Sequence, residues 1–261
     1  MPIPARLAVA VALLGAGIVA SESVRPLRNG FRAPAAWIGI DMAALQLTLV
    51  GFVLAVAWLL PARLPDTLGL RRSRLPLAAL AALVVGTLGL SHAIDGVMTL
   101  TRSHEGSVVV SVSRAFQAAR GWGLVVALLG SVLAPAVCEE LLCRGLVQRS
   151  VARAAGPLVA IAVSSVLFGV IHMEWTHGVI AALLGVYLGL AAYWADSTRP
   201  AIVAHGVNNL GALLGSQGLL RISAPPLESA AIGLALAAAG LGGAGWAHAR
   251  RLQREADLAD R

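Results

Sequence analysis

Charged residues are scarce in this chain of 261 residues, and lysine is absent altogether. Only 13% of the residues are charged, against roughly 25% in ordinary globular domains. Hydrophobic residues make up 58% of the chain, and the mean hydropathy is +0.80. This composition excludes an ordinary soluble domain. The two cysteines, Cys138 and Cys143, are five positions apart on one predicted helix and too far apart to form a disulfide, so we interpret both as small apolar residues.

The hydrophobic residues form long runs, and a membrane-spanning helix needs about 20 predominantly apolar residues. We therefore predict an all-α, polytopic transmembrane bundle of about eight helices, forming a single integral membrane domain over residues 1–261. The first run is as short as the apolar part of a signal peptide, but without a clean cleavage site it is predicted to be a retained helix. The runs are 7–20, 42–60, 75–94, 122–143, 157–171, 179–194, 200–219 and 230–246.

All 20 basic residues are arginines, and the formal net charge is +7. The arginines lie in short connections between the apolar runs, which is typical of topology signals and not of a phosphate-binding face. We therefore expect the lipid bilayer as a partner and no nucleic acid. With eight spans and the N-terminus inside, thirteen of the arginines, Arg144 among them, fall in inside connections and seven in outside ones. This asymmetry favours an N-in/C-in topology.

Ionisable groups inside a membrane are costly and are functional candidates by default. Most polar residues of the runs lie at or near run ends, where lipid headgroups can solvate them. Those assigned to this group are Asp41, Gln46, His92, Asp95, His104, Glu105, Glu174, His177 and His248. Three clusters remain as candidates.

The first cluster contains two adjacent acids, Glu139 and Glu140. Neighbours on a helix point about 100° apart, so the two carboxylates cannot face the same partner. Glu140 and Arg144 are four residues apart on one face, in the order that favours an ion pair. Glu139 is then left without a partner on its own helix and is available for chemistry. The alternative is that two acids simply end a helix near the interface.

The other two clusters each consist of a pair of residues four apart, and so on one helical face. Phe168 and His172 form one pair, and His205 and Asn209 form the other. His205 and Asn209 can both donate hydrogen bonds towards one point, as an oxyanion site requires. The alternative is a polar pair that joins its helix to a neighbouring helix.

The position of a predicted turn connects the first two clusters. The midpoint between Glu139 and His172 falls between Ala155 and Gly156, and Gly-Pro at 156–157 is the best turn signal of the region. A hairpin there would place Glu139 and His172 at the same height on neighbouring helices. The third cluster can meet the first two only if residues 144–155 project beyond the bilayer on the inside. We therefore expect a site within the membrane, towards the inside face.

Taken together, the clusters resemble the CAAX prenyl protease and bacteriocin-processing (CPBP, or Abi) family of intramembrane proteases. The family pattern is Glu-Glu-x-x-x-Arg, then Phe-x-x-x-His, then His-x-x-x-Asn/Asp, on separate helices in that order. All three motifs are complete in this chain, and the resemblance covers about residues 69–219. The matching residues are Glu139, Glu140, Arg144, Phe168, His172, His205 and Asn209.

The resemblance implies an intramembrane endopeptidase that hydrolyses a peptide bond with water. Carried over residue by residue, Glu139 is the general base and His172 helps to orient the water. His205 and Asn209 stabilise the oxyanion of the tetrahedral intermediate. A buried carboxylate tends towards a raised pKa, which suits a base that works near neutral pH.

The resemblance gives Glu140 and Arg144 a supporting role, as an ion pair that holds their helix. The family has been described both as zinc metalloproteases and as metal-independent glutamate proteases. A zinc set of Glu139, His172 and His205 is conceivable by ligand type. However, the sequence has no His-Glu-x-x-His motif, the compact arrangement of ligands and base on one helix. We therefore favour the metal-free mechanism and expect no cofactor.

The expected substrate is a membrane-associated peptide or protein. An all-arginine, Ala- and Gly-rich chain is typical of a GC-rich prokaryote, so we expect a prokaryotic cell membrane and a membrane peptide or bacteriocin-like precursor as substrate, and not a prenylated protein. Two alternatives stay open: a catalytically idle scaffold or immunity protein, and a transporter with an intramembrane carboxylate relay.

Overall fold

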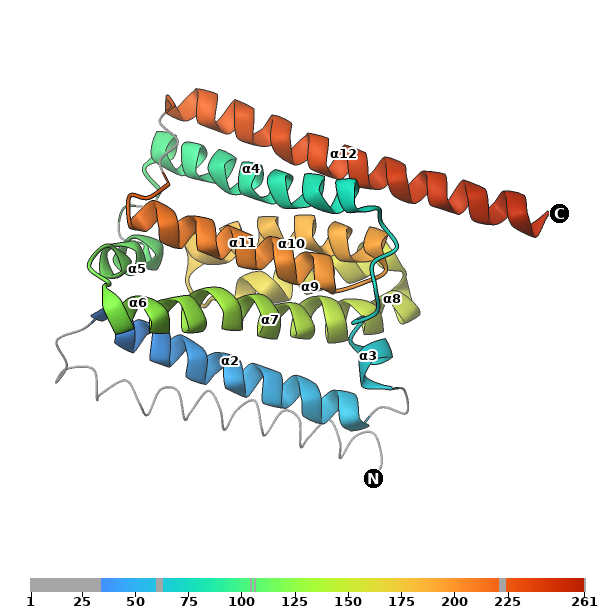
Figure 1. Cartoon of the computed structure of the whole chain (residues 1–261), viewed down its shortest axis with the longest axis horizontal. Helices are drawn as coiled ribbons and strands as arrows, with labels where there is room; N and C mark the ends of the chain where they lie inside the picture. The colour runs from blue at the N-terminus through green and yellow to red at the C-terminus, as the bar shows by residue number, and fades with distance from the viewer. Residues whose placement is uncertain (1–33, 60–62, 104, 106, 221–223, 261) are drawn as a thin grey trace.

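The computed structural model describes residues 34–59, 63–103, 105, 107–220 and 224–260. The described residues are helical almost throughout and contain no strand, so the predicted all-α bundle is confirmed (Figure 1). The predicted first span, residues 7–20, lies outside the described residues.

Most of each of the other seven predicted runs lies on a helix. The helix that contains the fourth run is unbroken from Gly121 to Ala155 and includes two wider, π-helical segments, η2 and η3. The elements are α2 (Pro34–Leu59), α3 (Leu64–Thr67), α4 (Leu77–Thr101), α5 (Val108–Gln117), α6 (Gly121–Leu128), η2 (Leu129–Leu133), α7 (Ala134–Glu140), η3 (Leu141–Gln148), α8 (Arg149–Ala155), α9 (Pro157–Val170), α10 (Trp175–Ala195), α11 (Arg199–Ser216) and α12 (Pro226–Ala259).

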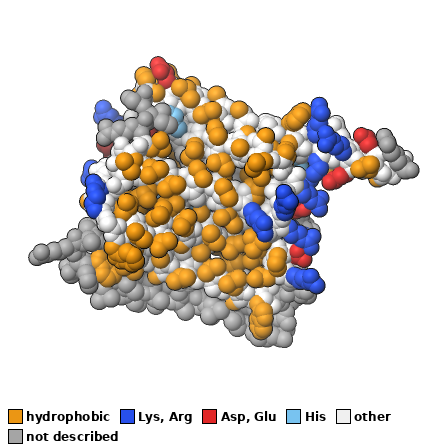
Figure 2. Space-filling view, viewed as in Figure 1, with side chains coloured by type: hydrophobic (Ala, Val, Ile, Leu, Met, Phe, Trp, Pro, Cys, Tyr) orange, Lys and Arg blue, Asp and Glu red, His pale blue; other side chains and the backbone are white. Residues whose placement is uncertain are grey.

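The bundle has the surface of an integral membrane protein. Among the described residues, five helices are long and apolar enough to cross a membrane: α2, α4, the helix Gly121–Ala155, α10 and α12. Helix α9 is also apolar but has only 14 residues. Figure 2 shows hydrophobic side chains over the middle of the visible face, while arginines gather mainly at the end where α12 leaves the bundle. This separation matches an apolar membrane interior between two polar interfaces.

Segments that the sequence assigned to the inside meet at that arginine-rich end. Arg74 pairs with Asp196 at 3.4 Å and with Glu255 at 3.8 Å, while Arg149 reaches Asp196 at 3.4 Å. These ion pairs connect the segment after α3, helix α8, the turn before α11 and the end of α12. The grouping agrees with the predicted topology, and the N-in/C-in orientation itself stays a prediction.

One described arginine that the sequence assigned to an inside connection, Arg144, does not lie at the surface. It is only 1% exposed and lies in the interior of the bundle, so its assignment to a connection was wrong. The reason is that the helix does not end near Cys143, where the apolar run ends, but continues to Ala155. Hydropathy marks the apolar part of such a helix and not its length.

Helices α4 and α12 run side by side and approach each other closely at glycines (Figure 1). A Cβ atom on Gly233 would collide with the carbonyl group of Gly89 and the backbone of Ala93. Small residues at such crossings let helix backbones pack at short distance. In lipid, helices associate largely through these close van der Waals contacts, because the hydrophobic effect does not drive apolar helices together there.

We predict that Gly233→Ala destabilises the bundle by about 1–3 kcal/mol, because the added methyl group meets backbone atoms that cannot move aside. Thermal unfolding of the detergent-solubilised chain measures the effect. Gly243→Ala is the matched control on the same helix, since a Cβ atom there has no neighbour within 4 Å. Equal melting temperatures for the two variants would contradict the close α4–α12 contact.

Candidate active site

The predicted hairpin between the first two motifs is present. Gly156 separates α8 from α9 with a φ of +83°, a conformation that favours glycine, and Pro157 begins α9. The two arms pack against each other, so that the guanidinium of Arg144 lies over the ring of Phe168 at 4.5 Å. The turn chosen from the sequence therefore brings the first and second motifs into contact.

A buried ion pair forms the centre of the site. Arg144 Nη1 donates to Glu140 Oε1 at 2.7 Å, and both side chains are fully buried. The predicted pairing of these two residues is thus confirmed. His205 Nδ1 lies 3.0 Å from the same carboxylate oxygen, although 65 residues separate the two in the sequence. The first and third motifs consequently meet at Glu140.

The π-helical segment η3 aligns two polar side chains with the neighbouring helix α10. Arg144 Nη2 donates to the carbonyl oxygen of Gly185, and Gln148 Nε2 donates to that of Gly189, both at 2.9 Å. A Cβ atom on Gly185 would lie 3.3 Å from Arg144 Nη2, so glycine leaves room for the guanidinium. π-Helical turns inside α-helices are frequent at functional sites.

Phe168 connects all three motifs through its ring, which is 1% exposed. Besides the guanidinium of Arg144, it contacts the imidazoles of His172 and His205 edge to face, with centroids 5.1 and 5.5 Å away. Edge-to-face pairs are favourable because the positive ring edge meets the negative ring face. The motif phenylalanine is therefore a packing platform for the polar residues.

His172 follows the end of α9 and has a defined hydrogen-bond pattern. Its Nδ1 lies 2.7 Å from the carbonyl oxygen of Phe168. Because a carbonyl oxygen only accepts, Nδ1 carries the proton, and Nε2 of the neutral ring keeps its lone pair. The ring also contacts that of His177 at 4.3 Å. The sequence interpretation assigned His177 to a run end and missed this contact, for which the short spacing between the two histidines was a weak signal.

Glu174 shapes the turn that holds His172. Its carboxylate accepts hydrogen bonds from the backbone N–H groups of Thr176 and His177, both at 2.9 Å, and so caps the start of α10. The backbone N–H of His177, followed by that of Thr176, lowers the pKa of this carboxyl group below its ordinary value. Its position at a helix end agrees with the sequence interpretation.

Glu139 faces away from the ion pair, as the angle between neighbours on a helix requires. It is 7% exposed, and its Oε1 accepts a hydrogen bond of 2.6 Å from Gln46 Nε2 on α2. Its Oε2 is buried and has no hydrogen-bond partner. Among the described residues, no hydrogen bond or ion pair joins Glu139 to His172 or His205. The candidate base therefore keeps one carboxylate oxygen free.

Gln46 corrects one interpretation of the sequence. It was assigned to a run end that headgroups solvate, whereas in the structure it is 1% exposed and contacts Glu139. The assignment failed because α2 begins at Pro34 and not at residue 42, where the apolar run begins. A polar side chain near the middle of a 26-residue helix was the signal that could have revealed it.

Asn209 is partly buried, and its side chain makes no hydrogen bond to another described residue. The neighbouring residue, Asn208, is the one that contacts another helix, through its Oδ1 and the hydroxyl of Ser91 on α4. The joint role of His205 and Asn209 as hydrogen-bond donors stays a prediction.

The described residues contain no group of three or more His, Cys, Asp and Glu side chains that could hold a metal ion. The alternative zinc set of Glu139, His172 and His205 is therefore not assembled as a metal site here, and metal dependence stays a prediction. The two cysteines are free and buried.

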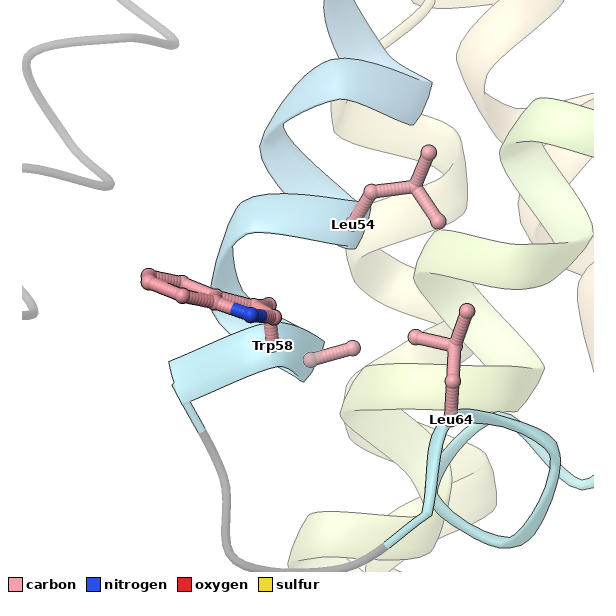
Figure 3. A pocket seen from close by; sticks show the side chains of 4 residues that line it. Leu54, Trp58 and Leu64 are labelled. Carbon is pink, nitrogen blue, oxygen red and sulfur yellow. The ribbon is translucent and has the colours of Figure 1, made fainter.

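One pocket on the bundle has no catalytic character. It is lined by Leu54, Ala57, Trp58 and Leu64, at the end of α2 and the start of α3 (Figure 3). These side chains carry no acid, base or charge, so the pocket is not the place where a peptide bond is hydrolysed.

We predict that Arg144→Met destabilises the bundle by about 3–5 kcal/mol, because it leaves the buried carboxylate of Glu140 without its counter-charge. Thermal unfolding in detergent measures this loss. The double variant Glu140→Gln/Arg144→Met removes both charges and should recover most of the stability. A single variant as stable as the unmodified chain would contradict the role of the pair.

Comparison with known proteins agrees with the sequence motifs. Residues 121–211 match the family model described as Type II CAAX prenyl endopeptidase Rce1-like. No curated protein and no solved structure is significantly similar to the chain. The matched segment extends from α6 into α11 and includes every residue of the three motifs. The match is consistent with the predicted resemblance to the CPBP family, and over residues 121–211 this integral membrane protein is similar to the type II CAAX prenyl endopeptidases.

Proposed function

We propose that the chain is an intramembrane endopeptidase in which Glu139 activates water to hydrolyse a peptide bond of a membrane-associated substrate. The observation that carries the proposal is the buried Glu139 carboxylate, with Oε1 held by Gln46 and Oε2 free, next to the cluster of Glu140, Arg144 and His205. The family match supports the reaction class.

Glu139 is suited to general base catalysis because its free Oε2 can accept a proton from water. The water oxygen then forms a bond to the carbonyl carbon of the substrate, and the carbonyl electron pair moves onto its oxygen. When this oxyanion collapses, the C–N bond breaks, and the proton held by Glu139 passes to the leaving amine nitrogen. The carboxylate is regenerated, and no other reactant is needed.

His172 is suited to orienting the water. With its Nδ1 proton donated to the carbonyl group of Phe168, the lone pair on Nε2 can accept a hydrogen bond from the second O–H of that water. The ring contacts the rings of both Phe168 and His177, which restrict its orientation. The base and the orienting group thus come from the two arms of one hairpin.

We assign the stabilisation of the oxyanion to His205 and Asn209. The Nδ1 of His205 is engaged with Glu140, so Nε2 is the ring nitrogen left to donate. Nε2 carries a proton when the ring is doubly protonated, and the Glu140 carboxylate can balance that charge. The side-chain amide of Asn209, one turn further along α11, would be the second donor. Donors placed before the charge develops stabilise it most in a site that excludes water.

We predict that Glu139→Gln lowers kcat by about 10²–10⁴-fold, the usual contribution of a general base. The full chain in liposomes is tested on two internally quenched peptides, one a farnesylated Cys-a-a-X peptide and the other an unprenylated membrane-spanning peptide. Glu228→Gln on α12 is the matched control, because Glu228 is exposed and outside the site.

Full activity of Glu139→Gln would remove Glu139 from the mechanism. If the unmodified chain cleaved neither peptide, the result would contradict the proposed activity and favour a membrane scaffold or immunity protein. Cleavage of one peptide and not the other would show whether the substrate carries a prenyl group.

We predict that activity survives prolonged dialysis against a zinc chelator, since the described residues provide no metal-binding group of three side chains. Peptide cleavage is measured before and after dialysis. Loss of activity that returns on adding Zn²⁺ would overturn the metal-free mechanism and point to Glu139, His172 and His205 as ligands.

A further inference from the structure

We propose that Gln46 on α2 is a positioning residue for Glu139, which makes α2 part of the catalytic machinery. This inference rests on the proposed role of Glu139 as the base. Gln46 belongs to none of the three motifs, and α2 lies outside the segment that matches the family model, residues 121–211.

The contact between the two side chains is short and buried. Gln46 Nε2 donates to Glu139 Oε1 over 2.6 Å, with Gln46 at 1% and Glu139 at 7% exposure. It is the only hydrogen bond to the Glu139 carboxylate among the described residues. A hydrogen bond from an amide to an ionised carboxylate is about twice as strong as one between neutral groups, and burial strengthens it further.

This single donor determines which carboxylate oxygen can take a proton. Because Oε1 is engaged by Gln46, Oε2 is the oxygen left to accept the proton in the proposed mechanism. After Oε2 accepts the proton, Oε1 becomes the carbonyl oxygen of the acid and can still accept from the same N–H group. Gln46 can therefore hold the carboxyl group in one orientation in both protonation states.

The packing of α2 keeps the amide in place. Leu49 and Val53, which follow Gln46 on α2, belong to one buried cluster with Cys138, Leu141 and Leu142 of the helix that carries Glu139. This apolar contact fixes the height of α2 relative to Glu139. The donor is thus positioned by a rigid helix and not by a loop, as precise catalytic geometry requires.

The test compares two methionine substitutions on the same helix. Gln46→Met keeps the length of the side chain and removes the donor, whereas Leu47→Met changes an exposed residue of the same helix that lies outside this buried cluster. In liposomes, on whichever quenched peptide the unmodified chain cleaves, we expect Gln46→Met to lower kcat by about 10–100-fold with KM within about two-fold. Leu47→Met should keep both constants.

A merely structural contact would have a different signature. It would lower the melting temperature of Gln46→Met while kcat per folded chain stayed unchanged, and that result would overturn the proposal. If Gln46→Met does not fold, Gln46→Asn replaces it, because asparagine keeps the amide but withdraws it by one methylene group. We expect kcat to fall in Gln46→Asn as well, and a full kcat there would equally overturn the role of Gln46.

Glu139→Gln, measured alongside, separates this inference from the proposed function. If Glu139→Gln is inactive and Gln46→Met is fully active, the role of Gln46 fails while the base remains Glu139. If Glu139→Gln is active, both fail together.

Discussion

The buried ion pair between Glu140 and Arg144 is the interaction on which the site depends. Two opposite charges with no exposure to solvent are tolerable when each has an oppositely charged or polar partner, and removing one partner is strongly destabilising. Arg144 meets this requirement through Glu140, the carbonyl oxygen of Gly185 and the ring of Phe168, while Glu140 also accepts from His205. The pair therefore fixes η3 relative to α9, α10 and α11.

Two adjacent glutamates acquire different properties from this arrangement. Glu140 is shared by an arginine and a histidine, so its carboxylate has a structural and electrostatic task. Glu139, the preceding residue, points towards α2 and retains one oxygen without a partner. Different environments for neighbouring carboxyl groups are a general means of dividing roles among acids in active sites. In the proposed mechanism, the pair holds the helix and the unpaired acid performs the proton transfer.

Much of the core could be predicted because it follows from spacing along the chain. Four-residue intervals place Glu140 with Arg144 on one face, and the turn at Gly156 is centred between Glu139 and His172. Both relations depend only on helix geometry. The predictions that failed, for Gln46 and Arg144, depend on where helices end, and hydropathy does not locate those ends when a helix extends past its apolar run.

The sequence by itself determined that the chain is a helical membrane protein, that its polar motifs stand in the order of a known protease family, and that two of the motifs face each other across a hairpin. Only the tertiary structure decided which partner each polar side chain contacts. Gln46 and Glu139 are 93 residues apart, and Glu140 and His205 are 65 apart. No periodicity within one helix relates residues so distant, because their contact depends on how the helices rotate and pack against one another.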